Sequence, residues 1–109
     1  ATAQVQLGWM YNNGEGVVKD DKQAAAWYRK AAEQGHIDAQ YNLGLMYSTG
    51  EGVAQDYKLA YVWSAVAAAN GDALAANNRD IFAKSLSPAA LAEAQTVAGQ
   101  YVEQYQPKQ

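Results

Sequence analysis

A segment of 36 residues occurs twice in succession in this chain, and this repeat limits the possible folds more than any other feature. When residues 3–38 are aligned with residues 39–74, 17 of the 36 positions are identical. A fixed period of about 20 to 50 residues is typical of repeat architectures, in which each unit stacks on its neighbours. We therefore expect a single domain over residues 1–109, with units at about 3–38, 39–74 and a degenerate third unit at 75–106.

Each unit is predicted to form two antiparallel helices. Apolar residues in its first half are four apart, and those in its second half follow the spacing i, i+3, i+7, so each set lies on one helical face. Between the halves, the sequence Gly-Glu-Gly-Val supplies two glycines that can adopt positive φ and let the chain reverse. Asp20 and Asp56 are then expected as N-caps of the second helices. The aromatic residues that recur in both units are expected in the core: Tyr11, Tyr47, Trp27 and Trp63.

Gly8 and Gly44 fall inside the predicted first helices, where glycine costs about 1 kcal/mol relative to alanine. A close approach of the second helix would explain glycine at this position, because a missing side chain leaves room for a neighbour. Trp27 or Trp63, one helix away, is expected to fill the space.

The third unit departs from the repeat, with Arg79 and Asp80 where the other units have Leu and Gly. Asp72 is a predicted N-cap for a helix over residues 73–83, and Ser87-Pro88 is typical of a second helix start. Because the last unit of an array must cover the apolar stripe of its neighbour, we expect this pair to act as a cap. One face of its final helix would carry Leu91, Ala94, Ala98, Tyr101 and Tyr105.

The second helix of the second unit carries no charge from residue 59 to residue 71. A helix that is apolar on all sides is normally buried on all sides. We expect the terminal helix of the same chain to cover it. A homodimer through the helix around Tyr61, Val62 and Val66 remains the alternative.

The unit common to both copies resembles the Sel1-like repeat, a relative of the tetratricopeptide repeat with a longer turn inside each hairpin. The shared residues are Ala-x-x-x-Leu-Gly-x-Met-Tyr-x-x-Gly-Glu-Gly-Val-x-x-Asp-x-x-x-Ala-x-x-Trp-x-x-x-Ala-Ala-x-x-Gly. The resemblance implies an all-α fold, a right-handed α-solenoid of antiparallel helix pairs, used as an adaptor or scaffold that assembles other proteins. It also favours the bacterial periplasm or a secreted location over the cytoplasm, while the residues themselves leave the compartment open.

In solenoids of this kind the first helix of each pair lines a concave surface that binds extended peptides. By the resemblance to tetratricopeptide repeats, the exposed inner face combines apolar side chains with amides and little charge. We therefore predict a protein or peptide partner that is extended and largely uncharged. The alternative is that these side chains pack between neighbouring first helices. The predicted partner-binding residues are Val5, Trp9, Asn12, Tyr41, Leu45, Ser48, Asn77 and Ile81.

Several other functions find little support in the composition. The chain has 8 Lys and Arg against 11 Asp and Glu, so it lacks the basic face that nucleic acids require. No apolar run reaches the roughly 18 residues that a membrane-spanning helix needs. It has no cysteine, and its single histidine, His36, lacks the companions of a zinc or catalytic site. Glu15 and Glu51 occupy equivalent turns rather than facing positions, and no Ser-x-x-Lys nucleophile motif occurs. We therefore expect no catalytic residues, no metal and no cofactor.

The predicted function is a non-catalytic interaction module that binds a protein or peptide segment on its concave face. The alternative is a structural element that mediates self-assembly or caps a longer repeat array. An enzyme acting on cell-wall material is the third and weakest candidate, because the sequence offers no catalytic group for it.

Overall fold

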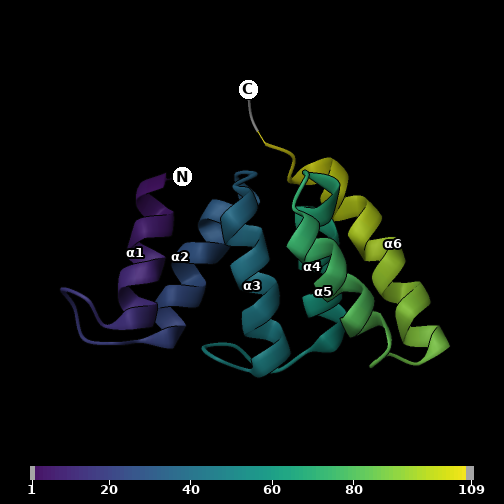
Figure 1. Ribbon diagram of the computed structural model, residues 1–109, viewed down its shortest axis with the longest axis horizontal. Coiled ribbons are helices and arrows are strands. Elements are labelled where there is room, and N and C mark those ends of the chain that lie inside the picture. Colours follow the sequence, from purple (N-terminus) through teal and green to yellow (C-terminus); the bar gives the residue numbers. More distant parts are fainter. Residues whose placement is uncertain (1, 108–109) are drawn as a thin grey trace.

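The computed structural model describes residues 2–107, and this range contains helices but no strand. The helices are arranged along the longest axis of the molecule, with α1 at one end, α6 at the other, and α4 and α5 overlapping in this view (Figure 1). Each helix from α1 to α4 packs against the next one along the chain, and α6 packs against α4. The expected all-α solenoid is confirmed, while residues 1, 108 and 109 of the expected domain lie outside the described range. The helices are α1 (Thr2–Asn13), α2 (Asp21–Glu33), α3 (Ile37–Thr49), α4 (Tyr57–Ala69), α5 (Ala73–Ala83) and α6 (Pro88–Gln104).

The predicted capping residues start four of the helices. Asp20 precedes α2 and Asp56 precedes α4, and each carboxylate accepts hydrogen bonds from two backbone N–H groups of the first turn, at 2.9 to 3.2 Å. Asp72 and Ser87 each accept one such bond, at 3.1 Å, from the first turns of α5 and α6. Pro88 occupies the first position of α6, where its missing N–H leaves no intrahelical bond unmade.

Replacing Asp56 with alanine is expected to lower the free energy of unfolding by about 1 kcal/mol, because two N–H groups at the start of α4 lose their acceptor. Asp56→Asn should keep most of that stability, since its amide oxygen can accept the same bonds. Urea denaturation followed by circular dichroism measures both variants. If both variants lowered the free energy of unfolding equally, the cap would contribute through its charge and not through its hydrogen bonds.

The turn of the second unit packs directly on the first unit. Gly16 and Gly52 occupy equivalent places in the two turns, and both have a φ of 75°, in the left-handed region that favours glycine. A Cβ atom added to Gly52 would overlap the backbone carbonyl of Asp21, in the first turn of α2. A Cβ atom added to Gly16 would meet only the methyl group of Met10, at 3.2 Å. Gly52 therefore forms an inter-repeat contact that Gly16 lacks.

The glycines inside the first helices mark close helix approach, as expected, but the residue opposite differs from the prediction. A Cβ atom added to Gly8 would lie 3.1 Å from the ring of Tyr28, and one added to Gly44 would lie 2.8 Å from Oγ of Ser64. Tyr28 and Ser64 each follow the tryptophan that was expected to fill this space, so that prediction is wrong. Successive helical residues project about 100° apart, and this rotation turns each tryptophan away from the glycine.

The two repeated tryptophans have different environments. Trp63 is 1% exposed, and its ring lies 5.3 Å from that of Tyr101 and 5.4 Å from that of Tyr105, both contributed by the C-terminal segment. Trp27 is only half-buried, and the ammonium of Lys30 lies 4.6 Å from its ring centre. The difference arises because α6 covers the second unit and not the first. Of the four aromatics expected in the core, Trp63 and Tyr47 are buried, while Trp27 and Tyr11 are half-buried.

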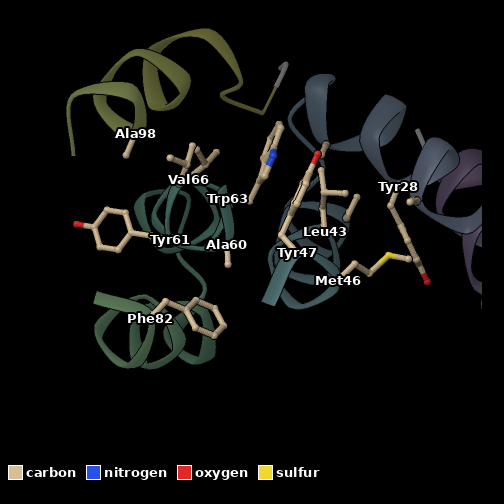
Figure 2. Packing of buried hydrophobic residues seen from close by; sticks show 14 of the residues in the cluster. Tyr28, Leu43, Met46, Tyr47, Ala60, Tyr61, Trp63, Val66, Phe82 and Ala98 are labelled. Carbon is tan, nitrogen blue, oxygen red and sulfur yellow. The ribbon is translucent and has the colours of Figure 1, made fainter. Parts of the chain in front are cut away.

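Helix α4 is enclosed by other helices of the same chain. Figure 2 shows Phe82 of α5 and Ala98 of α6 approaching α4 from opposite sides, and α3 packs on it as well. Tyr61, Val62 and Val66 are 9%, 1% and 0% exposed. The expected cover by the terminal helix is therefore confirmed. A homodimer through these three side chains stays a prediction, and in this structure α5 and α6 cover the surface that it would use.

The position of α6 explains why the third unit loses the repeat residues. Whereas α2 and α4 pack against the first helix of their own unit, α6 packs on α4 and leaves the corresponding side of α5 without a helix partner. Asp80 stands at the place of Gly8 and Gly44, and it forms an exposed ion pair with Arg79 at 3.1 Å. A charged side chain is tolerated there because no helix approaches it.

A buried amide ties the C-terminal segment to the first unit. Gln40 on α3 is 0% exposed, and its Nε2 donates hydrogen bonds to the carbonyl oxygens of Ala32, at 3.0 Å, and Tyr105, at 2.9 Å. Its Oε1 accepts a bond from Nδ2 of Asn70 at 3.0 Å. One side chain thus links the ends of α2, α4 and α6, and all of its bonds are made inside the protein.

Candidate partner-binding surface

The predicted binding residues occupy equivalent positions on α1, α3 and α5, because they are 36 residues apart. Val5, Tyr41 and Asn77 form one such set, and Trp9, Leu45 and Ile81 form another; Asn12 and Ser48 are the third set, without a member on α5. Their exposure divides them into two groups. Trp9, Asn77 and Ile81 are exposed, whereas Val5, Asn12, Tyr41, Leu45 and Ser48 are half-buried.

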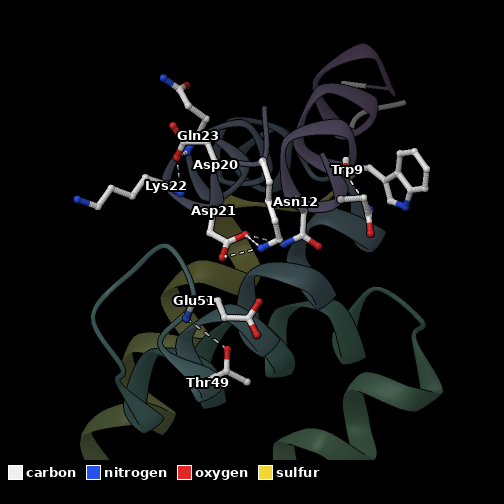
Figure 3. Close-up of polar contacts among 10 residues, drawn as sticks. Trp9, Asn12, Asp20, Asp21, Lys22, Gln23, Thr49 and Glu51 are labelled. Atoms are coloured by element: carbon white, nitrogen blue, oxygen red, sulfur yellow. Dashed lines mark hydrogen bonds and ion pairs between the residues drawn. The ribbon is translucent and has the colours of Figure 1, made fainter. Parts of the chain in front are cut away.

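Trp9 and Ile81 supply most of the exposed apolar area among these residues. Trp9 is 48% exposed, and its indole projects from α1 away from the helices behind it (Figure 3). Ile81 on α5 is 57% exposed. Single exposed apolar residues are ordinary on protein surfaces, but tryptophan is among the residues most enriched at the centres of protein interfaces.

The half-buried residues are partly used by the fold itself. Val5 and Leu45 pack against the hydrophobic core. The hydroxyl of Ser48 donates a hydrogen bond to the carbonyl oxygen of Leu45 at 2.6 Å, within α3. Val5 and Leu45 therefore contribute to the packing of the fold, whereas the bond of Ser48 lies within its own helix.

Asn12 and Leu45 both line a cavity of about 250 Å³. Asn12 also donates a 3.4 Å hydrogen bond to the carboxylate of Asp21, which accepts a 2.9 Å bond from Lys19 (Figure 3). Burial raises the pKa of the Tyr28 hydroxyl in the wall, so this group stays protonated and can donate a hydrogen bond. The remaining wall residues were not predicted from the sequence: Tyr28, Met46, Thr49 and Glu51. The helical glycine opposite Tyr28 was the sequence signal that could have placed it there.

The remaining candidates for chemistry stay isolated. His36 lies beside a wide-open hollow of about 640 Å³, whose other titratable wall residues are Asp38 and Asp72. Glu51 lines the smaller cavity, and Glu15 does not. Within residues 2–107, no group of three or more His, Cys, Asp or Glu side chains is placed to hold a metal ion. In the same range, no helix combines the length and the apolar character needed to cross a bilayer.

The repeat geometry agrees with the comparison to known families. The Sel1 repeat matches residues 1–36 and 37–72, so one repeat contains α1 and α2 and the next contains α3 and α4. The chain belongs to the Sel1 repeat family. Sel1 repeat proteins are generally protein-interaction or scaffold modules, and the family is typically non-catalytic. Helices α5 and α6 lie outside the two matched repeats.

Two solved structures illustrate the similarity. The crystal structure of c5321, a protective antigen present in uropathogenic Escherichia coli strains that displays an SLR fold, shares 44% identity over 94% of this chain, with a TM-score of 0.91. A Sel1 repeat protein from Oxalobacter formigenes shares 46% identity over 72% of this chain, with a TM-score of 0.71. This chain spans 22% of the first protein and 59% of the second. No curated protein sequence gave a match.

Proposed function

We propose that the surface formed by α1, α3 and α5, the expected concave face, binds an extended and largely uncharged segment of a protein partner. The observation that carries this proposal is the exposed apolar pair at equivalent repeat positions, Trp9 on α1 and Ile81 on α5. Two large apolar side chains held by separate helices can anchor separate positions along one extended peptide.

The side chains around these anchors suit a backbone ligand. Asn77 on α5 is exposed and Asn12 borders the cavity beside α1, and an amide can both donate to and accept from a peptide backbone. All eight residues of the proposed surface are uncharged. A strongly charged ligand would therefore find no opposite charge among them, which favours a ligand of low charge.

Phage display of low-charge peptides on the immobilised 109-residue chain would supply ligands, and fluorescence anisotropy would give their Kd values. Trp9→Ala is expected to weaken the selected peptides by about 30-fold, because truncation of an interface anchor costs about 2 kcal/mol or more. Ile81→Ala should also weaken binding, by a smaller factor. Both side chains are exposed, so neither change should lower the stability of the fold.

Val18→Ala is the matched control, since Val18 is 87% exposed but lies in the turn after α1, outside the proposed surface. It should leave the Kd unchanged. Peptides that bind the Trp9→Ala and Ile81→Ala variants as tightly as the unmodified chain would contradict the proposal.

A second candidate function, the end element of a longer repeat array, is favoured by the position of α6. This helix covers α4, and α5 carries the charged pair Arg79 and Asp80 where the repeat has an apolar residue and glycine. A second helix placed on α5 as α2 lies on α1 and α4 lies on α3 would meet these charged side chains. These features support a closing role for α5 and α6.

A further inference from the structure

The cavity of about 250 Å³ where α1, α2 and α3 meet has a buried floor and an exposed edge. Tyr28 and Met46 in its wall are only 3% and 5% exposed, whereas Thr49 and Glu51 are exposed. The hydroxyl of Thr49 accepts a 3.3 Å hydrogen bond from the backbone N–H of Glu51, which holds that residue close to the end of α3 (Figure 3). The two other wall residues, both part of the proposed binding surface, are Asn12 and Leu45. This space is called the Tyr28 cavity below.

The polar groups that the Tyr28 cavity offers to a ligand are mainly hydrogen-bond acceptors. The hydroxyl of Tyr28 makes no hydrogen bond within residues 2–107, although the residue is almost fully buried. Nδ2 of Asn12 already donates to Asp21, which leaves Oδ1 of Asn12 as an acceptor. The carboxylate of Glu51 can only accept. A ligand group that only donates hydrogen bonds fits this set, and the ammonium of lysine and the guanidinium of arginine are such groups.

The charges around the Tyr28 cavity favour a cation as well. Asp21, beside Asn12, is paired with Lys19 at 2.9 Å. Glu51 takes part in none of the ion pairs formed within the described part of the chain. Its charge is therefore not neutralised by a neighbouring side chain, and it attracts a positive group that approaches the edge of the cavity.

The residues that give the Tyr28 cavity its polar character are absent from the next junction of the repeat. At the positions 36 residues further along the chain, serine replaces Asn12, Tyr28 and Glu51. Tyr28 fits at its own junction because Gly8 leaves room for it, since a Cβ atom added to Gly8 would lie 3.1 Å from the ring. The packing of one unit on the next therefore does not require these three side chains, which leaves them available for recognition.

We propose that the Tyr28 cavity binds the side chain of one lysine or arginine of the partner segment. The aliphatic stem of that side chain packs against Leu45 and Met46. Its cationic head lies between the carboxylate of Glu51 and Oδ1 of Asn12. Pockets for small molecules usually have volumes of roughly 300 to 1,000 Å³, so the Tyr28 cavity is better suited to a single side chain. The inference rests on the proposed function for the partner, and it adds one positive charge to a segment that is otherwise largely uncharged.

The test uses the 109-residue chain, labelled with ¹⁵N, and three small probes. These are the N-acetyl methylamides of lysine, arginine and norleucine, of which norleucine has the unbranched stem without the cation. In NMR titrations a basic probe should shift the backbone amides of Thr49 and Glu51 and the side-chain amide of Asn12 until they saturate. The norleucine probe should bind clearly more weakly. Glu51→Gln is expected to raise the Kd of the basic probes by about fivefold, as the loss of one exposed ion pair does.

Glu15→Gln is the matched control, because Glu15 occupies the same place in the first turn, is exposed and does not line the cavity. It should leave the Kd unchanged. Tyr28→Phe removes only the hydroxyl and keeps the ring beside Gly8. It should weaken the basic probes without lowering the urea midpoint, a combination that a purely structural role of the hydroxyl would not produce.

Two results would overturn the inference: equal binding of the norleucine and basic probes, or equal Kd values for the Glu51→Gln and Glu15→Gln variants. Neither result would affect peptide binding through Trp9 and Ile81. If selected peptides were instead insensitive to Trp9→Ala and Ile81→Ala, the proposed function would fail, while the small probes would still show whether the Tyr28 cavity binds a basic side chain.

Discussion

Replacing Trp63 with alanine is expected to lower the free energy of unfolding by about 3 to 5 kcal/mol, the usual cost of truncating a large buried aromatic residue. Trp63 is 1% exposed and contacts the rings of Tyr101 and Tyr105. The substitution therefore leaves a cavity and also removes the aromatic contact that holds the C-terminal segment on α4. Urea denaturation gives the stability, and hydrogen exchange in α6 should accelerate more than exchange in α1.

Trp27→Ala is the matched control, because Trp27 occupies the same repeat position and is only half-buried. Trp27→Ala should lower the free energy of unfolding clearly less than Trp63→Ala does, since no terminal helix covers Trp27. Trp9→Ala should have almost no effect on stability, as its side chain is 48% exposed. Equal losses at Trp27 and Trp63 would show that the repeat position, and not the cover by α6, determines the contribution.

Replacing Gly52 with alanine is expected to lower the free energy of unfolding by about 2 to 5 kcal/mol. The left-handed conformation costs a residue with a Cβ atom about 1 to 2 kcal/mol, and forcing additional atoms into a packed site costs about 1 to 3 kcal/mol. The second cost arises because the new Cβ atom would overlap the backbone carbonyl of Asp21, which cannot rotate away as a side chain can.

Gly16→Ala separates the two costs, because Gly16 has the same φ of 75° but contacts only the flexible end of Met10. In the 109-residue chain it should cost only the conformational strain, about 1 to 2 kcal/mol. Urea denaturation of both variants under identical conditions makes the comparison. If the two variants lose the same stability, the contact between the second turn and α2 contributes nothing.

Much of the fold could be predicted from local chemistry. The 36-residue period identified the two helix pairs, and Asp20, Asp56, Asp72 and Ser87 start helices as expected, because a capping side chain acts within its own first turn. The partner of Gly8 was predicted wrongly. Spacing along the sequence shows that a neighbour comes close, but which neighbouring side chain faces the glycine depends on the rotation of the second helix.

The candidate site was less accessible to sequence reasoning. Equivalent repeat positions place Trp9, Leu45 and Ile81 on corresponding faces of three helices, and the sequence alone identifies that correspondence. It does not say which of the three is free, because exposure depends on what packs beside each helix. Leu45 packs against the core, whereas the other two side chains are exposed.

The sequence by itself determined the helix pairs, their turns and their caps, because these follow from periodicity and from interactions between near neighbours in the chain. Only the tertiary structure decided that α6 lies on α4 instead of on α5, and that Tyr61, Val62 and Val66 are buried within the chain. Those outcomes depend on contacts between residues far apart in sequence, such as the 65-residue separation between Gln40 and Tyr105, which no local pattern encodes.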